Sequence, residues 1–197
     1  MQRQKDLTQR LLGAVAAILV LATLTAAKGT NDTFPDIKIK NFGQMDERFY
    51  RGAQPKKLED YQALAALGIK TVIDLRNDPK SYEKGMVESV GMKYVNLPMS
   101  DKKYPQEAQI DAFLSLINEP GTGAFYVHCA GGRHRTGVMG AVYRFTKYGW
   151  NFDQVYKEMK DFDFYTRWGH GDMKKYVVDY SQRAPSVPVT DAVAAGN

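Results

Sequence analysis

The stretch HCAGGRHRTG (residues 128–137) contains the only cysteine of the chain. Residues 124–128 predict a short strand, and the apolar side chains of residues 138–145 recur at helical spacing. A strand therefore leads into a glycine-rich turn, and the turn opens a helix. Because Gly131 and Gly132 permit backbone conformations that other residues rarely adopt, successive N–H groups of this turn can point into one concavity and bind an oxyanion.

Cys129 lies at the bottom of this concavity and is predicted to be a nucleophile. Its pKa should fall below the usual value of about 8.5, because the helix N-terminus and the guanidinium of Arg135 favour the thiolate. Arg135 follows six positions later, and its planar fork can hold two phosphate oxygens. Thr136 can donate a hydrogen bond to the sulfur. These residues predict a two-step hydrolysis of phosphate esters through a phospho-cysteine.

The other residues of the turn are predicted to surround the phosphate together with Arg135. They are Ala130, Gly131, Gly132, Arg133 and His134. The side chains of Arg133 and His134 either contact further phosphates or lie in solvent at the rim. His128 is predicted to order the loop through a hydrogen bond, and a direct effect on the thiolate is the alternative.

Strands and helices alternate around this stretch. Strands are expected at residues 37–42, 48–50, 71–75, 93–97 and 124–128. Apolar residues at helical spacing predict helices at residues 58–67, 82–90, 105–117, 138–145, 152–159 and 173–180. This order predicts a single α/β domain with a central, mostly parallel sheet that is flanked by helices. Ligands of such sheets bind beyond the carboxyl ends of the strands, and residue 128 lies at such an end.

The stretch resembles the His-Cys-x5-Arg-Thr/Ser signature of the cysteine-dependent protein tyrosine and dual-specificity phosphatases. Cys129, Arg135 and Thr136 match the nucleophile, the phosphate-binding arginine and the hydroxyl position of that family. YRGAQP (residues 50–55) and GIKTVIDLR (residues 68–76) resemble the opening strands of the atypical dual-specificity branch of plants, fungi and many bacteria. The resemblance extends over about residues 34–180, and it implies a dual-specificity phosphatase-like fold and a phosphatase activity.

The first of two departures from the family pattern concerns the substrate. Arg133 and His134 stand where tyrosine phosphatases usually have small apolar residues, which resembles branches that act on inositol phosphates, inositol pyrophosphates or phosphoinositides. Those branches usually have a further basic residue where this chain has Gly131. The resemblance therefore implies either a phosphorylated protein or a polyphosphorylated small molecule as substrate.

The general acid is the second departure, because the chain has no Trp-Pro-Asp loop. Cleaving a bond to a poor leaving group needs a proton donor beside the bridging oxygen. Asp101 lies 28 residues before Cys129, close to the usual separation in the family, and is the predicted acid. Asp74, Asp161 and Asp163 are the competing candidates.

Residues 1–27 are predicted to be a signal peptide or an N-terminal membrane anchor. Basic residues precede an uncharged apolar run at residues 11–27 that ends in small residues, which is the order of a secretory signal with cleavage after Ala27. The run is also just long enough to span a bilayer of about 30 Å. Both alternatives export the remainder across the cytoplasmic membrane, as a periplasmic, secreted or anchored protein.

Composition limits the remaining possibilities. The 197 residues, 44% of them hydrophobic and 25% charged, suit one globular domain, expected at residues 28–182, with a disordered tail at residues 183–197. One cysteine and three unclustered histidines argue against a disulfide, a metal site or a cofactor. The net charge of +5 is too diffuse to indicate nucleic acid. Oligomeric state is left open.

Two other functions could use the same loop. A rhodanese-type sulfurtransferase also has a loop cysteine, but the sequence Arg135-Thr136-Gly137 at the helix start favours phosphate. A non-catalytic domain that binds a phosphate ligand is the alternative from another class. The presence of both Cys129 and Arg135 argues against it.

Overall fold

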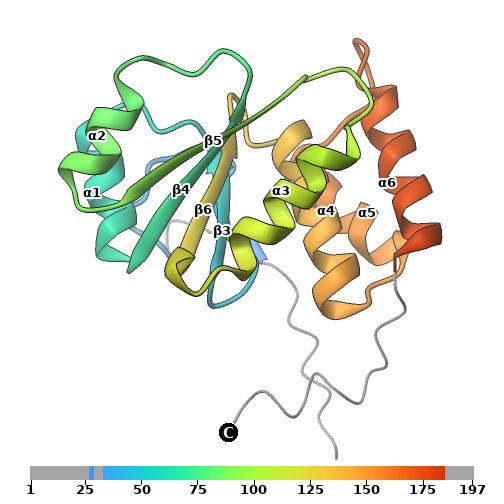
Figure 1. Cartoon of the computed structure of the whole chain (residues 1–197), viewed down its shortest axis with the longest axis horizontal. Coiled ribbons are helices and arrows are strands. Elements are labelled where there is room, and N and C mark those ends of the chain that lie inside the picture. The colour runs from blue at the N-terminus through green and yellow to red at the C-terminus, as the bar shows by residue number, and fades with distance from the viewer. Residues whose placement is uncertain (1–26, 29–32, 185–197) are drawn as a thin grey trace, which may run out of the picture.

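One α/β domain is seen in the computed structural model, which describes residues 27–28 and 33–184 (Figure 1). Six strands of this described part form one sheet in the order β1-β2-β3-β6-β4-β5. The strands are β1 (Ala27–Lys28), β2 (Gly43–Gln44), β3 (Phe49–Ala53), β4 (Ile69–Arg76), β5 (Lys93–Met99) and β6 (Ala124–Cys129). β3, β6, β4 and β5 run parallel, whereas β1, β2 and β3 pair antiparallel. The predicted fold class is confirmed.

Helices cover both faces of the sheet (Figure 1). α1 (Leu58–Ala66) and α2 (Glu83–Ser89) cover one face. The other face is covered by α3 (Glu107–Asn118), α4 (His134–Tyr148), α5 (Phe152–Asp161) and α6 (Gly171–Arg183). Alternate side chains of the central strands point to opposite faces, so that Val72 packs in the core under α1 and Ile73 in the core under α4.

Most predicted elements occur with shifts of a few residues at their ends. The turn after α1 has Gly68 at φ +83°, as expected of a glycine that ends a helix. β5 continues two residues past the predicted end and includes Pro98, which an edge strand tolerates because one side of its backbone needs no sheet partner.

The strand predicted at residues 37–42 is wrong. Ile37, Ile39 and Phe42 are buried, so the apolar pattern is real, but they belong to a loop that packs on the core beneath α1. Asn41 adopts φ +54°, which interrupts an extended strand. β3 then extends to Ala53, three residues beyond the predicted strand.

The predicted leader and tail fall largely outside the described residues. Residues 1–26 and 185–197 are not described, and the predicted cleavage point after Ala27 lies within β1. α6 ends at Arg183. Within residues 27–28 and 33–184, no helix has the length and apolar character needed to cross a membrane.

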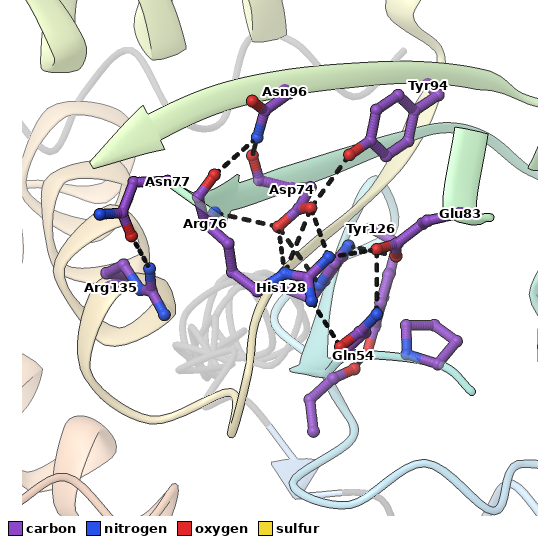
Figure 2. Close-up of polar contacts among 12 residues, drawn as sticks. Gln54, Asp74, Arg76, Asn77, Glu83, Tyr94, Asn96, Tyr126, His128 and Arg135 are labelled. Carbon is purple, nitrogen blue, oxygen red and sulfur yellow. Dashed lines mark hydrogen bonds and ion pairs between the residues drawn. The ribbon is translucent and has the colours of Figure 1, made fainter. Parts of the chain in front are cut away.

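A buried cluster of charged side chains connects β4, α2 and β6 near the carboxyl end of β6, where His128 lies (Figure 2). The guanidinium of Arg76 pairs with both Asp74, at 2.7 Å, and Glu83. It also donates to the side-chain oxygen of Gln54, the residue that follows β3. His128 Nε2 lies 3.0 Å from Glu83 Oε1. Burial raises the pKa of Asp74, but the hydrogen bonds from Arg76 bring it below its ordinary value.

Replacing Arg76 by Met should lower the free energy of unfolding by about 3–5 kcal/mol, because two buried carboxylates would lose their counter-charge. Urea denaturation measures the change. Lys84→Met is the matched control: Lys84 pairs with Glu88 at 3.8 Å on the exposed face of α2, where such a pair contributes about 0.5 kcal/mol. Similar small losses in both variants would show that the buried cluster does not hold the domain together.

Candidate active site

A cavity of about 210 Å³ lies at the carboxyl ends of the parallel strands. Its lining comes from the loop after β6, the start of α4, the loop after β5 and the loop between α5 and α6. The lining residues are Asp101, Cys129, Ala130, Gly131, Arg133, His134, Arg135, Tyr165 and His170. The structure therefore brings together most residues that the sequence analysis selected. Gly132, Thr136 and His128 lie behind this lining.

The phosphate loop, residues 130–133, is held from outside by hydrogen bonds to three successive carbonyls. The Gln54 N–H donates to the Ala130 carbonyl at 3.5 Å, and Asn41 Nδ2 donates to the Gly131 carbonyl at 3.1 Å. Arg51 Nη2 donates to the Gly132 carbonyl at 3.0 Å. In a peptide unit the N–H points opposite to the carbonyl. These hydrogen bonds hold the three carbonyls outward, so the N–H of each following residue points into the cavity. The expected oxyanion cradle is thus built by partners outside the loop.

Arg51 is a residue of this site that the sequence analysis missed. It projects from β3, is fully buried, and its guanidinium lies 4.0 Å from the centre of the Phe162 ring. Burial lowers its pKa to about 10, and the attraction of Glu158 and of Cys129 opposes that change, so the group is charged at neutral pH. The signal was an arginine inside the otherwise uncharged strand FYRGA.

The Cys129 thiol is only 4% exposed, and opposing influences act on its pKa. Burial raises the pKa, whereas the hydroxyl and backbone N–H of Thr136, the charge of Arg135 and the Gly131 N–H lower it. The lowering influences prevail, so the pKa lies below its ordinary value. The Thr136 hydroxyl is itself buried, and among the described groups it makes no other hydrogen bond of normal geometry.

Arg135 is oriented by two acceptors at the ends of neighbouring strands. Its Nη1 donates to Asn77 Oδ1 at 3.2 Å (Figure 2). The same Nη1 donates to the Met99 carbonyl at 3.3 Å. Asn77 directly follows β4, and the sequence analysis did not select it. The sequence signal that could have identified Asn77 is its position directly after the VIDLR strand, because the carboxyl ends of parallel strands lie at the same edge of a sheet.

His128 faces away from the cavity and into the buried charged cluster. Its Nδ1 lies 3.8 Å from Asp74 Oδ1, and its Nε2 faces Glu83. Atoms of these three residues lie within 4.8 Å of one another, a spacing that suits a metal ion. The guanidinium of Arg76 already pairs with both carboxylates, so an arginine supplies the positive charge that faces them.

Comparisons with known proteins agree with this geometry. Residues 34–169 match the family described as "PTP-NADK: DSP-PTPase phosphatase fused to NAD+ Kinase". OCA1 of Mycosarcoma maydis, named as a tyrosine-protein phosphatase, is 30% identical over 130 residues, which are 62% of this chain and 79% of that protein. The chain belongs to the DSP-PTPase phosphatase family. It is a cysteine-based phosphatase and thus a hydrolase.

Other relatives of this phosphatase share its fold. The dual-specificity protein phosphatase TpbA of Pseudomonas aeruginosa is 26% identical over 132 residues, which are 67% of this chain and 56% of that protein. Its crystal structure matches with a TM-score of 0.64 at 22% identity, covering 89% of this chain and 99% of that one. The catalytic core of the PP-IP phosphatase SIW14 from S. cerevisiae also gives 0.64, at 20% identity over 73% of this chain and 87% of that one.

The four candidate acids of this phosphatase lie in different surroundings. Asp101 lines the cavity. Asp74 is buried against Arg76, and Asp161 pairs on the surface with Lys157 at 3.0 Å. Asp163 Oδ2 lies 4.0 Å from the Nε of Arg133, outside the cavity lining.

The two basic candidates at the rim differ in charge. His134 is buried and stacks on His170, and burial followed by the charge of His170 lowers its pKa to about 4. It therefore adds no positive charge to the cavity at neutral pH. Arg133 is about half exposed and remains charged, beside Asp163. Lys102 and Lys103 are exposed and do not line the cavity.

Gly132→Ala should abolish activity and destabilise the domain, whereas Gly131→Ala should leave the free energy of unfolding within about 1 kcal/mol. Gly132 has φ +66°, and an added Cβ would lie 2.3–2.6 Å from the backbone of Gly52 and Ala53. A Cβ on Gly131 would meet nothing closer than 3.8 Å. Thermal unfolding and hydrolysis of p-nitrophenyl phosphate measure both variants. Full activity of Gly132→Ala would contradict the described loop.

Proposed function

We propose that this phosphatase transfers the phosphoryl group of a phosphomonoester first to Cys129 and then to water. The carrying observation is the cysteine itself, which lies in the cavity with a lowered pKa between Arg135 and the inward-facing N–H groups of the loop. A thiolate is the nucleophilic form of cysteine, so this arrangement supplies an attacking group at neutral pH.

In the first step the Sγ thiolate attacks phosphorus, an S–P bond forms and the P–O bond to the leaving group breaks. Arg135 and the loop N–H groups stabilise the negative charge on the three other phosphoryl oxygens. Asp101, in its protonated form, donates its proton to the departing oxygen, so that an alcohol leaves.

In the second step water attacks phosphorus of the phospho-cysteine. The Asp101 carboxylate takes a proton from the water, an O–P bond forms and the S–P bond breaks. Inorganic phosphate leaves and the thiolate returns. A hydrogen bond from Thr136 stabilises the thiolate as leaving group, consistent with its lowering of the Cys129 pKa.

Asp101→Asn should lower kcat for phenyl phosphate about a hundredfold or more, because a poor leaving group needs the proton. The same variant should change kcat for 2,4-dinitrophenyl phosphate by less than about threefold, since that leaving group departs as an anion. Steady-state phosphate release measures both. Cys129→Ser should remove turnover of both substrates.

Asp161→Asn is the matched control, because Asp161 carries the same group on the surface outside the cavity lining. It should behave as wild type with both substrates. Equal losses of Asp101→Asn on the two substrates would exclude Asp101 as the acid. Retained turnover in Cys129→Ser, or the absence of a phosphoenzyme in wild-type reactions quenched with denaturant at alkaline pH, where an S–P bond is stable, would exclude the phospho-cysteine route.

For the substrate, we infer a phosphorylated protein side chain that carries a single phosphate. The cavity lining contains two arginines, Arg133 and Arg135. The negative charges of Asp101 and Cys129 oppose their positive charge, and His134 is uncharged. A highly charged inositol polyphosphate would need more cations than this lining supplies. TpbA, which has the same fold, has been crystallised with pTyr, whereas SIW14 is a PP-IP phosphatase, so the fold itself does not choose.

A phosphotyrosyl peptide should therefore show a kcat/KM about tenfold or more above that of an inositol polyphosphate, a difference of about 1.4 kcal/mol. Arg133→Ala should lower kcat/KM for the peptide by no more than about fivefold, as expected of one half-exposed charge. Phosphate release measures both, and Lys103→Ala, an exposed lysine outside the lining, is the control. A higher value for the inositol polyphosphate that Arg133→Ala selectively removes would support the alternative substrate.

We also propose that the domain acts outside the cytoplasm. Support comes from the sequence of residues 1–27 alone, where basic residues precede an apolar run that ends in small residues. A cleaved signal and an uncleaved anchor are both consistent with that sequence.

A further inference from the structure

The loop that carries Asp101, residues 98–103, is fixed through its backbone to two helices and to the residue before a third. Gln109 of α3 donates to the Pro98 carbonyl at 2.7 Å, and Arg135 of α4 donates to the Met99 carbonyl. The carbonyl oxygen of Asp101 itself also makes a hydrogen bond. It lies 2.7 Å from Nδ1 of His170, the residue before α6. This loop is called the acid loop below.

The contact between His170 and Asp101 fixes the tautomer of the histidine. A carbonyl oxygen only accepts hydrogen bonds, so Nδ1 of His170 must carry the hydrogen. His170 is 7% exposed, and the bond is therefore largely shielded from water. The backbone of Asp101, the proposed proton donor, is thus held by a buried side chain from another part of the chain.

The chain reaches this position through two successive residues in the left-handed region. Trp168 has φ +57° and Gly169 has φ +89°. A bulky residue with positive φ is strained and persists where surrounding contacts enforce it, most often at functional sites. The Trp168 side chain is 71% exposed, so its own burial does not explain the conformation.

His170 also contacts the phosphate loop side of the cavity. Its ring stacks on the ring of His134, the first residue of α4, with centroids 3.5 Å apart and planes 10° apart. Tyr165 packs edge-on against both rings, at 4.3 Å and 5.5 Å. The low pKa of His134 keeps this stack free of repulsion between two cations at neutral pH. The pair His134 and His170, named here the histidine clasp, joins the acid loop to the helix that carries Arg135.

We propose that His170 is a positioning residue that sets the distance between the Asp101 carboxyl and the leaving oxygen held over Cys129. It acts through the Asp101 backbone and takes its own position from the stack on His134. The proposal rests on the proposed role of Asp101 as general acid. Displacing a catalytic group by about 1 Å can cost a hundredfold in rate, so one hydrogen bond at this place has a measurable effect.

The test uses the full chain with His170→Ala, His170→Asn and His170→Gln. Asn places an amide nitrogen where Nδ1 lies, whereas the amide of Gln lies one bond further out. His170→Ala and His170→Gln should lower kcat for phenyl phosphate about tenfold or more, with less than about threefold change for 2,4-dinitrophenyl phosphate. His170→Asn should restore kcat for phenyl phosphate to within about threefold of wild type.

A double variant shows whether His170 acts through Asp101. Asp101→Asn with His170→Ala should be no slower on phenyl phosphate than Asp101→Asn alone, because the acid is already lost. Additive losses would overturn the proposal, as would equal losses of His170→Ala on both substrates, which a purely structural role produces. If His170→Ala does not fold, the Asn and Gln variants decide, and identical behaviour of those two overturns the proposal.

The two proposals fail in distinguishable ways. If Asp101→Asn shows no dependence on the leaving group, the acid assignment is wrong and the role of His170 falls with it. If Asp101→Asn shows that dependence and His170→Ala does not, only the positioning role is excluded.

Discussion

The close contact of the Gly132 backbone with Gly52 and Ala53 is the constraint on which the site depends. At both Gly132 and Gly52 a Cβ would lie 2.3 Å from a neighbouring atom, a backbone carbon in the first case and the Tyr126 hydroxyl in the second. Gly132 thus lets the phosphate loop lie directly on the end of β3, and Gly52 leaves room there for the Tyr126 hydroxyl. Because of this contact, Arg51 of β3 can donate to the Gly132 carbonyl, and the N–H groups of the loop face the cavity. The lowered pKa of Cys129 follows from this backbone arrangement together with Thr136 and Arg135.

Buried arginines sustain the arrangement from two sides. Arg76 is compensated by Asp74 and Glu83, and it connects β4 with α2 and with the residue after β3. Arg51 donates to a loop carbonyl and lies over the face of Phe162, and Glu158 and Cys129 attract its charge. Removing the counter-charge of a buried group costs several kcal/mol, so both guanidiniums restrict how the strand ends can move.

The sequence predicted the features that depend on local patterns and missed those that depend on tertiary contacts. Hydrophobic spacing located β4, β6 and all six α-helices to within a few residues, and the spacing of Cys129, Arg135 and Thr136 located the cavity. The same spacing was misleading at residues 37–42, where buried side chains belong to a loop. The roles of Asn77, Arg51 and His170 were missed, since each acts through a backbone carbonyl or a side chain far away in the sequence. His134 was taken as a potential cation, and only its burial against His170 shows that it is neutral.

The acid loop and the phosphate-binding arginine share their supports, which has a consequence for catalysis. Arg135 donates to the Met99 carbonyl, two residues before Asp101, and the histidine clasp binds the Asp101 carbonyl to the start of the same helix. A displacement of α4 would therefore move the nucleophile's cradle, the arginine and the acid together. Catalytic groups need to keep their mutual distances to a fraction of an ångström, and mounting them on common supports achieves this without a separate closing movement of the acid loop.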